Sequence, residues 1–465
     1  MLGSSAHLFR THRSSLNLAL SLVILAGCGG SHSTPPAPTI ATFSALPAEI
    51  SVGQGTLLAY EFSGGTAAID QGVGALASPG SQAVTPTTTT TYTLTANNQG
   101  VLSTATATVR VKTFVSKFVY VANAGGGVSG FTLDDATGAL APMANSPFDP
   151  SLSALHVTSD PTGKFLFVVN GDGETDLDQL SVYHIDPSSG NLTPAATPVV
   201  PTLSSPWCAA VDPTGKFVHV RCDGAIQSFS LDTTTGALSH PVSTPASAGH
   251  GDLLVHPSGL YLASVGRSSD QLDMFNHNPA TGALTRNGAA YALPAGTGPL
   301  GVSFSHTGEF LFVQGEGLAM GPAGDCAIHG YHLDIRSGLL SALGPVVTGL
   351  NASDAYHPLT CNPTRSSLYT ALFNSSQDLV AYTFNPGSPA TAMTPILGSP
   401  YAWFNGDGSD AIVVSRNGKW AIAPDYNGHQ IALAAVDSTT GALGSPTLTD
   451  VELFPVSVTV VGILQ

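Results

Sequence analysis

Residues 160–170 read Asp-Pro-Thr-Gly-Lys-Phe-Leu-Phe-Val-Val-Asn, a tight turn followed by an aromatic and β-branched run. A run of this kind directly after a Pro/Gly turn predicts a β-strand. The same turn recurs as Asp-Pro-Thr-Gly at residues 212–215. Variants of the turn begin at His256, Ser305, Asn362 and Ser415. The recurrence indicates one supersecondary unit that is copied along the chain.

A second hairpin signal, Thr-Gly-Ala-Leu or a close variant, also recurs, once in each repeat. It begins at Thr137, Ser189, Thr235, Thr281, Ser337 and Thr440, and a degenerate copy lies near residues 385–387. Each unit therefore predicts four short strands, which suits one blade of a β-propeller. Seven copies between Lys117 and the C-terminus predict an all-β fold with a seven-bladed propeller.

The two ends of this repeat region complement each other. The first copy begins at residues 117–121, which correspond to the second strand of a blade. The missing inner strand reappears at residues 455–462, Pro-Val-Ser-Val-Thr-Val-Val-Gly, with no second strand after it. We therefore expect the last strand to complete the first blade, which leaves no open sheet edge.

The N-terminus is predicted to be a targeting segment. Arg10 and Arg13 precede an apolar run at residues 16–24, which is too short to favour a permanent membrane span, and Leu-Ala-Gly-Cys follows at 25–28. This pattern resembles the lipobox of bacterial lipoproteins, which implies a lipid anchor on Cys28 after processing of residues 1–28. An ordinary secretory signal with a chance cysteine is the alternative. No aspartate follows Cys28, so we expect the outer membrane in a cell with two membranes.

Two segments separate Cys28 from the propeller. Residues 29–38, rich in Pro, Ser and Gly, predict a tether. Residues 39–113 predict a small β-sandwich whose run at 85–95 resembles bacterial immunoglobulin-like modules. We expect this module to be a spacer, with ligand binding as the alternative.

Composition limits the partners. The chain has 14 basic and 30 acidic residues, and its net charge of −16 becomes −18 once a leader with Arg10 and Arg13 is removed. Such a surface does not neutralise phosphates, so nucleic acid is not expected as a partner.

Four cysteines remain after Cys28. An even number of cysteines in an exported chain permits two disulfides, with three possible pairings. Cys208 and Cys222 flank one Asp-Pro-Thr-Gly hairpin on strands expected to be neighbours, so we expect Cys208–Cys222, with Cys326–Cys361 linking adjacent blades. A zinc site is the weaker alternative, because the chain has no Cys-x-x-Cys spacing.

Residues 118–123, Phe-Val-Tyr-Val-Ala-Asn, together with the two turn motifs resemble the lactonase family of seven-bladed propellers. That family includes 6-phosphogluconolactonase-like and carboxymuconate-cyclase-like members. The resemblance covers residues 114–465 and implies hydrolysis of a lactone where the central channel opens. A fold of this kind hosts many functions, so the activity depends on the site.

The family pattern places a histidine six residues before the first turn, and His250 matches it. Asp270 falls where the pattern has an aspartate in the next loop, and Glu316 matches a family glutamate. The resemblance implies that His250 or Glu316 activates water and that Asp270 orients an imidazole. Where the family has arginine and histidine, this chain has Leu300 and Gly301.

The missing cation needs a replacement, because a developing oxyanion requires a donor. Arg221 and Arg267 each follow a second strand and are the candidates. Trp207 and His357 fall at inner-strand starts, where a ring could stack on a sugar. For each of these residues the alternative is structural: a loop cap for His250, a solvated turn for Glu316 and packed strand ends for the rings.

The sequence indicates no cofactor. Two oxygen-rich loops suggest Ca²⁺ as a possibility, although neither has the spacing of an EF-hand and solvated turns are favoured. Their members are Asp172, Glu174, Asp176 and Asp178 in one loop and Asn405, Asp407 and Asp410 in the other.

We therefore expect an exported, membrane-anchored propeller that hydrolyses an unphosphorylated sugar or other lactone. A phosphorylated substrate would require a bidentate arginine, and that position is lost here. A non-catalytic propeller that binds a glycan, peptide or protein outside the cytoplasm is the alternative.

Overall fold

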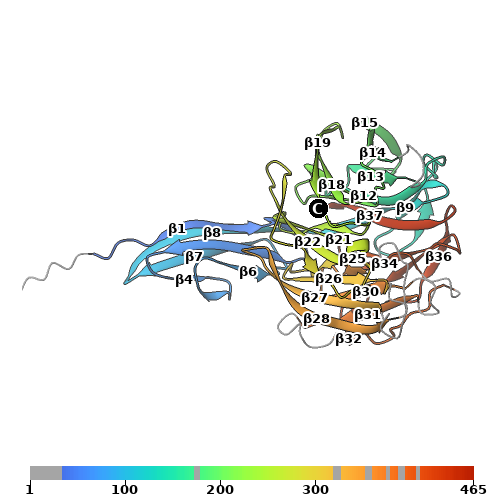
Figure 1. The fold of residues 1–465 in the computed structure, drawn as a ribbon. Helices are drawn as coiled ribbons and strands as arrows, with labels where there is room; N and C mark the ends of the chain where they lie inside the picture. Colours follow the sequence, from blue (N-terminus) through green and yellow to red (C-terminus); the bar gives the residue numbers. More distant parts are fainter. Residues whose placement is uncertain are drawn as a thin grey trace, which may run out of the picture.

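The computed structural model describes residues 34–171, 178–317, 326–350, 359–372, 378–385, 393–404 and 409–465. Within these ranges the regular secondary structure is β-strand, apart from one short 3-10 helix at Arg267–Ser269. The strands form a broad rounded part and a narrow module that projects from it (Figure 1). No helix in the described part of the chain is long and apolar enough to cross a membrane.

The rounded part is a propeller, as the repeats predicted. Seven sheets, or blades, are present in the described residues, and each runs from an inner to an outer strand. Six have four strands, and the outer strand of the other is in two pieces. Blade 1 consists of β37 (Pro455–Leu464), β9 (Phe114–Asn123), β10 (Gly127–Leu133) and β11 (Leu140–Pro142). Blade 2 consists of β12 (Ala154–Ser159), β13 (Phe165–Asn170), β14 (Gln179–Ile185) and β15 (Leu192–Pro201). Blade 3 consists of β16 (Cys208–Val211), β17 (Phe217–Cys222), β18 (Ala225–Leu231) and β19 (Leu238–Pro245).

The remaining blades repeat this order. Blade 4 consists of β20 (Leu253–Val255), β21 (Tyr261–Gly266), β22 (Gln271–His277) and an outer strand in two pieces, β23 (Leu284–Arg286) and β24 (Tyr291–Ala292). Blade 5 consists of β25 (Pro299–Phe304), β26 (Phe310–Gly315), β27 (Cys326–Asp334) and β28 (Leu339–Leu350). Blade 6 consists of β29 (Leu359–Cys361), β30 (Ser367–Ala371), β31 (Leu379–Thr383) and β32 (Thr394–Pro395). Blade 7 consists of β33 (Val413–Val414), β34 (Trp420–Asp425), β35 (Gln430–Ala435) and β36 (Thr447–Asp450).

The ring closes through the last strand, as expected from the sequence. Strand β37 pairs antiparallel with β9 in blade 1, with Val458 opposite Val121 and Thr459 opposite Tyr120. A hydrophobic cluster then joins blade 7 to blade 1, and it contains both Ile422 and Val121. Closure pairs an edge that would otherwise be open to other chains.

Two turns of the repeat, those that begin with aspartate, are stabilised by their own carboxylates. Asp160 accepts hydrogen bonds from the backbone N–H groups of Thr162 (2.9 Å), Lys164 (2.7 Å) and Phe165 (2.7 Å). Asp212 makes the equivalent contacts in blade 3. The repeated aspartate therefore fixes the step from an inner strand to a second strand.

The second hairpin of each unit meets the neighbouring blade. Gly236 has φ +74°, and a Cβ there would lie 2.6 Å from the ring of Phe165 in blade 2. A left-handed backbone that so closely approaches an aromatic ring excludes larger residues. The Thr-Gly signal therefore specifies blade-to-blade packing as well as a turn.

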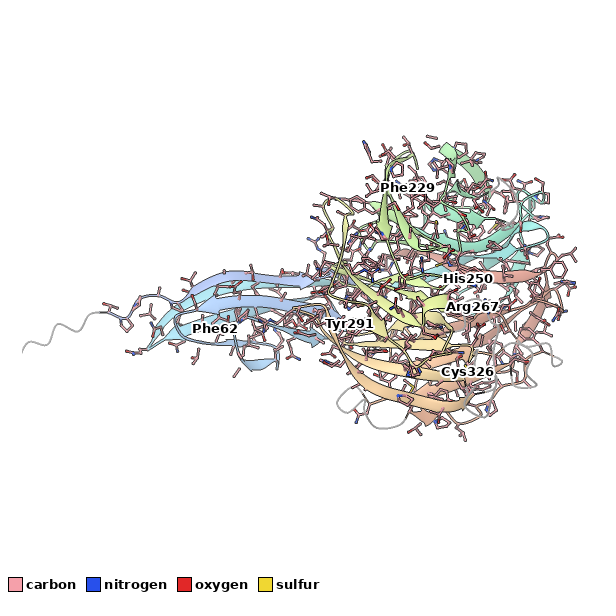
Figure 2. The ribbon with its side chains drawn as sticks, in the orientation of Figure 1. Phe62, Phe229, His250, Arg267, Tyr291 and Cys326 are labelled. Atoms are coloured by element: carbon pink, nitrogen blue, oxygen red, sulfur yellow. The ribbon has the colours of Figure 1, made fainter. Side chains whose placement is uncertain are left out.

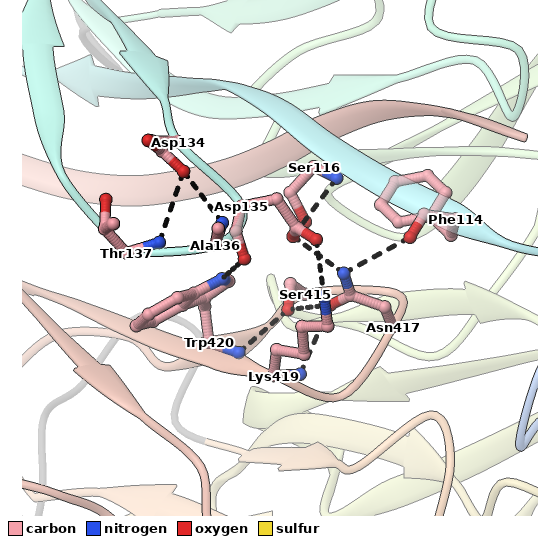
Figure 3. A network of polar contacts seen from close by, with 10 residues as sticks. All are labelled: Phe114, Ser116, Asp134, Asp135, Ala136, Thr137, Ser415, Asn417, Lys419 and Trp420. Carbon is pink, nitrogen blue, oxygen red and sulfur yellow. Dashed lines mark hydrogen bonds and ion pairs between the residues drawn. The ribbon is translucent and has the colours of Figure 1, made fainter.

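A polar network completes the seam between blades 7 and 1 (Figure 3). The Asp135 carboxylate accepts hydrogen bonds from Lys419 Nζ (2.7 Å) and Asn417 Nδ2 (2.8 Å), and Trp420 Nε1 donates to its backbone oxygen (3.3 Å). Burial alone would raise the pKa of Asp135, but hydrogen bonds from Lys419, Asn417 and Ser116 outweigh it and lower the pKa. The two ends of the ring are therefore joined by charge-assisted contacts as well as by packing.

The projecting module has two sheets with one core between them. One sheet contains β1 (Thr39–Leu46), β3 (Thr56–Ser63) and β6 (Gly80–Val84). The other contains β2 (Glu49–Ser51), β8 (Val101–Lys112), β7 (Thr90–Asn98), β4 (Thr66–Ile69) and β5 (Gly74–Leu76). Leu58, Tyr60 and Leu94 are buried between them. Only Thr113 separates β8 from β9, so the module is joined to the propeller without a flexible linker.

The predicted disulfides are wrong in this structure, because all four cysteines are free and buried. Cys208 lies opposite Arg221, not Cys222, and successive residues of a strand face opposite sides. Cys208 therefore packs between blades 3 and 4, whereas Cys222 packs between blades 2 and 3. Cys326 and Cys361 pack in one cluster between blades 5 and 6, still as thiols.

Candidate functional site

Three predicted residues meet at one mouth of the channel, which we call the upper mouth. Inner and second strands run antiparallel, so the start of an inner strand lies beside the end of the second strand. His250 precedes the inner strand β20, whereas Arg267 follows β21 and Glu316 follows β26. Blades 4 and 5 therefore bring to one place residues that are up to 66 positions apart in the chain.

Arg267 lies between the other two side chains. Its Nε donates to Glu316 Oε1 in an ion pair, and its Nη1 donates to His250 Nε2 at 3.1 Å. His250 and Arg267 are also labelled close together in Figure 2, and the Arg267 backbone N–H donates to the His250 carbonyl at 3.0 Å. The guanidinium thus links a predicted base to a predicted carboxylate.

The Arg267 contact defines the state of the imidazole. Arginine only donates hydrogen bonds, so Nε2 of His250 must be the acceptor and its proton must lie on Nδ1. Burial lowers the pKa of His250, and the positive charge of Arg267 lowers it further. The imidazole is therefore neutral at neutral pH, as a general base must be.

Glu316 is buried, with 3% of its side chain exposed, whereas 31% of the Arg267 side chain is exposed. The solvated-turn alternative for Glu316 is therefore wrong. A buried carboxylate is stable as an ion only when a charge partner and hydrogen bonds replace water. Arg267 supplies the charge and a hydrogen bond, and within the described ranges its Nη2 donates to no protein group. One edge of the guanidinium can therefore donate to a ligand.

Trp207 contacts the site from blade 3. Its ring stacks on the His250 imidazole with a centroid separation of 4.2 Å and an interplanar angle of 16°. Trp207 immediately precedes β16, so it comes from an inner-strand start as expected. The tryptophan therefore orients the imidazole plane, and its contact is not only strand-end packing.

Arg221 is not placed to touch a substrate, which corrects one prediction. Its side chain is fully buried, and Nη2 donates to the carbonyl oxygens of Ser247 (2.5 Å) and Gly249 (2.7 Å). These carbonyls belong to the segment that leads directly into His250. Arg221 therefore holds the backbone beneath the site and is a positioning residue.

Asp270 also has a different role from the predicted one. Its carboxylate accepts the backbone N–H groups of Gly296 and Gly298, both at 2.7 Å. Asp270 has a left-handed backbone after the short helix, which aims its side chain at the loop before β25 and not at His250. It fixes that loop and does not orient the imidazole.

Sequence reasoning missed Asp223, which immediately follows β17. Its Oδ1 accepts the Gly249 backbone N–H at 2.8 Å, and its negative charge partly opposes the lowering of the His250 pKa. Its position in the repeat could have identified Asp223, since a residue directly after a second strand lies at the upper mouth.

At the position of the family arginine, Leu300 is buried, and its backbone oxygen accepts the Asp252 N–H at 2.9 Å. The cation at this mouth therefore comes from blade 4, through Arg267, and not from blade 5.

Several predictions fall outside the described residues. His357, Cys28, and the loop residues Asp172, Glu174, Asp176, Asn405 and Asp407 lie there. Asp178, which is described, accepts the Ser205 backbone N–H at 2.9 Å. Among the residues the structure describes, no group of three or more His, Cys, Asp or Glu side chains is placed to hold a metal ion.

Comparisons with known proteins agree with this architecture. The family model described as "Lactonase, 7-bladed beta-propeller" matches residues 204–304, which include Trp207, His250 and Arg267. A search of curated proteins found no matching relative.

Solved structures match about three quarters of this chain and nearly all of their own length. A proposed 6-phosphogluconolactonase from Bacteroides fragilis is 18% identical, with a TM-score of 0.60 over 74% of this chain and 98% of its own. The periplasmic gluconolactonase of Pseudomonas aeruginosa is 18% identical, with a TM-score of 0.60 over 75% of this chain and 99% of its own. At this identity the similarity establishes the fold and leaves the reaction open.

Proposed function

Because residues 114–465 form a seven-bladed propeller of the lactonase type, we propose that the chain hydrolyses a lactone at the upper mouth. The observation that carries the proposal is the His250–Arg267–Glu316 arrangement. It combines a neutral imidazole with an exposed cationic edge, the two groups that ester hydrolysis requires. His250 and Arg267 both lie within the segment of family similarity.

In the proposed reaction, Arg267 donates to the carbonyl oxygen of the lactone. When Nη1 of Arg267 also turns from His250 to this oxygen, His250 Nε2 is released. It then removes a proton from water as the hydroxide attacks the acyl carbon. The tetrahedral oxyanion is stabilised by the guanidinium, and its collapse breaks the ring C–O bond. The imidazolium returns the proton to the departing alkoxide, and the product is a hydroxy acid.

The other residues position these groups. Glu316 fixes the guanidinium through Nε, and Trp207 fixes the imidazole plane by stacking. Because one oxygen of Glu316 already engages Arg267, we assign it a positioning role and assign the base to His250.

An unphosphorylated sugar lactone fits best. In the described part of the mouth, Arg267 is the cation beside His250, and it is already engaged by Glu316. A sugar phosphate would require a further bidentate cation. The similarity of this propeller to the periplasmic gluconolactonase of Pseudomonas aeruginosa supports the same class.

We also propose that the chain is exported and anchored to the cell envelope through a lipid on Cys28. The support is the sequence of residues 10–28, with its basic residues, apolar run and terminal cysteine. Incorporation of labelled palmitate into the expressed protein, and its loss in Cys28→Ala, would test the anchor. Labelling that persists in Cys28→Ala would contradict it.

The deciding experiment is lactone hydrolysis by the processed chain, module included. The substrates are glucono-δ-lactone, its 6-phosphate and an aromatic lactone, each with and without Ca²⁺. Saturable turnover of glucono-δ-lactone is expected, and His250→Gln is expected to lower kcat by about 100-fold or more. Arg110→Gln, an exposed arginine of the module, is the matched control. Unchanged turnover in His250→Gln would remove the base assignment.

One observation favours a second candidate. The Nε2 acceptor of His250 is engaged by Arg267 in the resting site, which is the arrangement of a satisfied ion-pair network. A propeller that binds a sugar acid without turnover would use Arg267 in the same way. Calorimetric binding of gluconate, combined with no hydrolysis of any lactone in the panel, would favour this binding function.

A further inference from the structure

The lower half of the channel contains a cavity of about 490 Å³. The propeller side of this cavity is formed by the later residues of inner strands. These include Ser159, Val211, Val255, Phe304, Cys361 and Val460. Since the candidate site lies where inner strands begin, the cavity lies toward the opposite mouth, which we call the lower mouth.

The remaining wall of the cavity comes from the projecting module. Pro47, Glu49, Ile50, Gln54 and Gly55 line it, and all five lie in or around β2. Figure 1 shows the module meeting the propeller end-on, not along its rim. The module therefore covers the lower mouth with the turns at its tip.

The contact between tip and propeller is close. The Gly55 backbone N–H donates to the His306 carbonyl at 3.2 Å. A Cβ on Gly55 would lie 2.9 Å from Thr307 Cα, and a Cβ on Gly53 would lie 2.7 Å from Thr364 Cβ. Such separations leave no room for a side chain, so the tip is fitted to the turns of blades 5 and 6.

The junction also restrains the module. Thr113, the residue between β8 and β9, exchanges backbone hydrogen bonds with Gln465 at 3.0 and 2.8 Å. Glu49 forms an ion pair with Lys112 at 3.0 Å beside this junction. A one-residue connection that is itself hydrogen-bonded to the C-terminus permits little hinge motion.

We propose that the module is a stopper: it closes the lower mouth, so that ligands reach the site only through the upper mouth. The upper mouth is then the one route wide enough for ligand exchange. The closure comes from packed backbone and does not depend on the lactonase chemistry.

Together with the proposed anchor and the proposed function, on which this step rests, the stopper limits the class of substrate. The described chain begins at Thr34, at the end of the module remote from the propeller (Figure 1). An anchor at Cys28 would therefore place the stopper between the membrane and the channel. The upper mouth would face away from the bilayer, so the substrate would be a water-soluble lactone and not a membrane-embedded one.

Accessibility of the cavity tests the stopper directly. Thr459 lines the cavity and is partly exposed, so Thr459→Cys places a thiol there with little change in size. All variants carry Cys361→Ala, because Cys361 is a free thiol in the wall of the same cavity. A polymer-linked maleimide is expected to leave this thiol unmodified in the intact chain. Adding Gly55→Leu, which clashes with Thr307 across the interface, is expected to speed labelling about tenfold or more.

Two controls keep the result interpretable. Thr234→Cys, in an exposed turn, should react quickly in both backgrounds. Thr307→Trp creates the clash from the propeller side and leaves the module sequence intact, so it should open the cavity as Gly55→Leu does. Circular dichroism checks that each variant is folded.

Rapid labelling of Thr459→Cys in the otherwise unchanged chain would overturn the stopper. Labelling of Thr459→Cys at the same rate with and without Gly55→Leu or Thr307→Trp would also overturn it. Neither result depends on lactone turnover, so the stopper and the proposed function can fail separately.

Discussion

At the scale of single residues, Arg267 determines what the candidate site can do. It neutralises the buried Glu316 carboxylate and keeps His250 in its neutral form with Nε2 unprotonated. Each effect depends on the fixed positive charge of the guanidinium, which no protonation change can remove. The site therefore depends on one side chain that the family pattern does not place there.

The first prediction concerns pH. His250 acts as a base only when deprotonated, so kcat/KM should fall as the pH drops through its lowered pKa. Arg267→Gln removes a positive charge that opposes the imidazolium, so the pKa of His250 should rise. The acid limb of the pH–rate profile should therefore move to higher pH, in addition to the loss of rate. An acid limb at the same pH in both proteins would contradict this link.

The second prediction concerns Arg221. Its guanidinium satisfies buried carbonyl oxygens of Ser247, Gly249 and Val265, which belong to blade 4 and its entry loop. Arg221→Met should therefore lower the free energy of unfolding by roughly 3–5 kcal/mol, since buried acceptors lose their donor. Urea denaturation measures this change. Arg110→Met, at an exposed site of the module, should change stability by less than about 0.5 kcal/mol.

At the scale of elements, the repeat motifs encode contacts between elements as well as turns. Asp160 and Asp212, which begin two of the first turns, accept backbone N–H groups within their own blades. In the second hairpins that the structure describes, the glycine approaches an aromatic ring of the preceding blade, as Gly236 shows against Phe165. The same short motif therefore builds a blade and aligns it with its neighbour.

The third prediction concerns the seam between blades 7 and 1. Hydrogen bonds from Lys419 and Asn417 lower the pKa of Asp135 against the effect of burial. A carboxylate with a lowered folded-state pKa stabilises the protein above its unfolded pKa, and this contribution is lost as pH falls through the folded one. Asp135→Asn should cost about 1 kcal/mol at neutral pH.

The measurement is urea denaturation of the wild type and of Asp135→Asn, at neutral pH and below about pH 4, the ordinary pKa of an aspartate. The difference between them should shrink at the acidic pH, because wild type then loses the same charge. Asp450→Asn, which removes an exposed carboxylate, is the control. A difference that stays constant across pH would show that the charge of Asp135 is not involved.

Strand positions were predictable because turn residues mark them on both sides. The run at residues 164–170 predicted a strand, and β13 occupies Phe165–Asn170. Side-chain roles at the mouth were less predictable. Asp270 and Arg221 lie at the expected strand ends, yet their partners are backbone groups of other loops. Spacing along the chain does not reveal which of several nearby backbone groups a polar side chain will reach.

At the scale of the whole molecule, the first and last elements of the propeller depend on each other. Strand β37 supplies the inner strand of blade 1, and Gln465 pairs with Thr113 at the module junction. The C-terminus, the first blade and the module therefore form one continuous region, and loss of one should affect all three.

The fourth prediction follows from this closure. A chain that ends at Phe454 lacks β37 and leaves β9 with an unpaired edge. We expect it to aggregate or to unfold at a lower temperature, since an open edge pairs with other chains. Size-exclusion chromatography and thermal melting provide the measurement. A synthetic peptide of residues 455–465 should restore part of the stability, and a truncated chain that is monomeric and equally stable would contradict the role of β37.

The sequence by itself determined the all-β class, the repeat, the blade order and the closing strand. These depend on local turn chemistry and strand periodicity, which act over a few residues. Only the tertiary structure decided which side chains meet at the mouth, that the four cysteines are free, and that the module covers the lower mouth. Seven blades bring distant residues to one channel, and the distances between them are set by packing of the whole ring, which no short segment encodes.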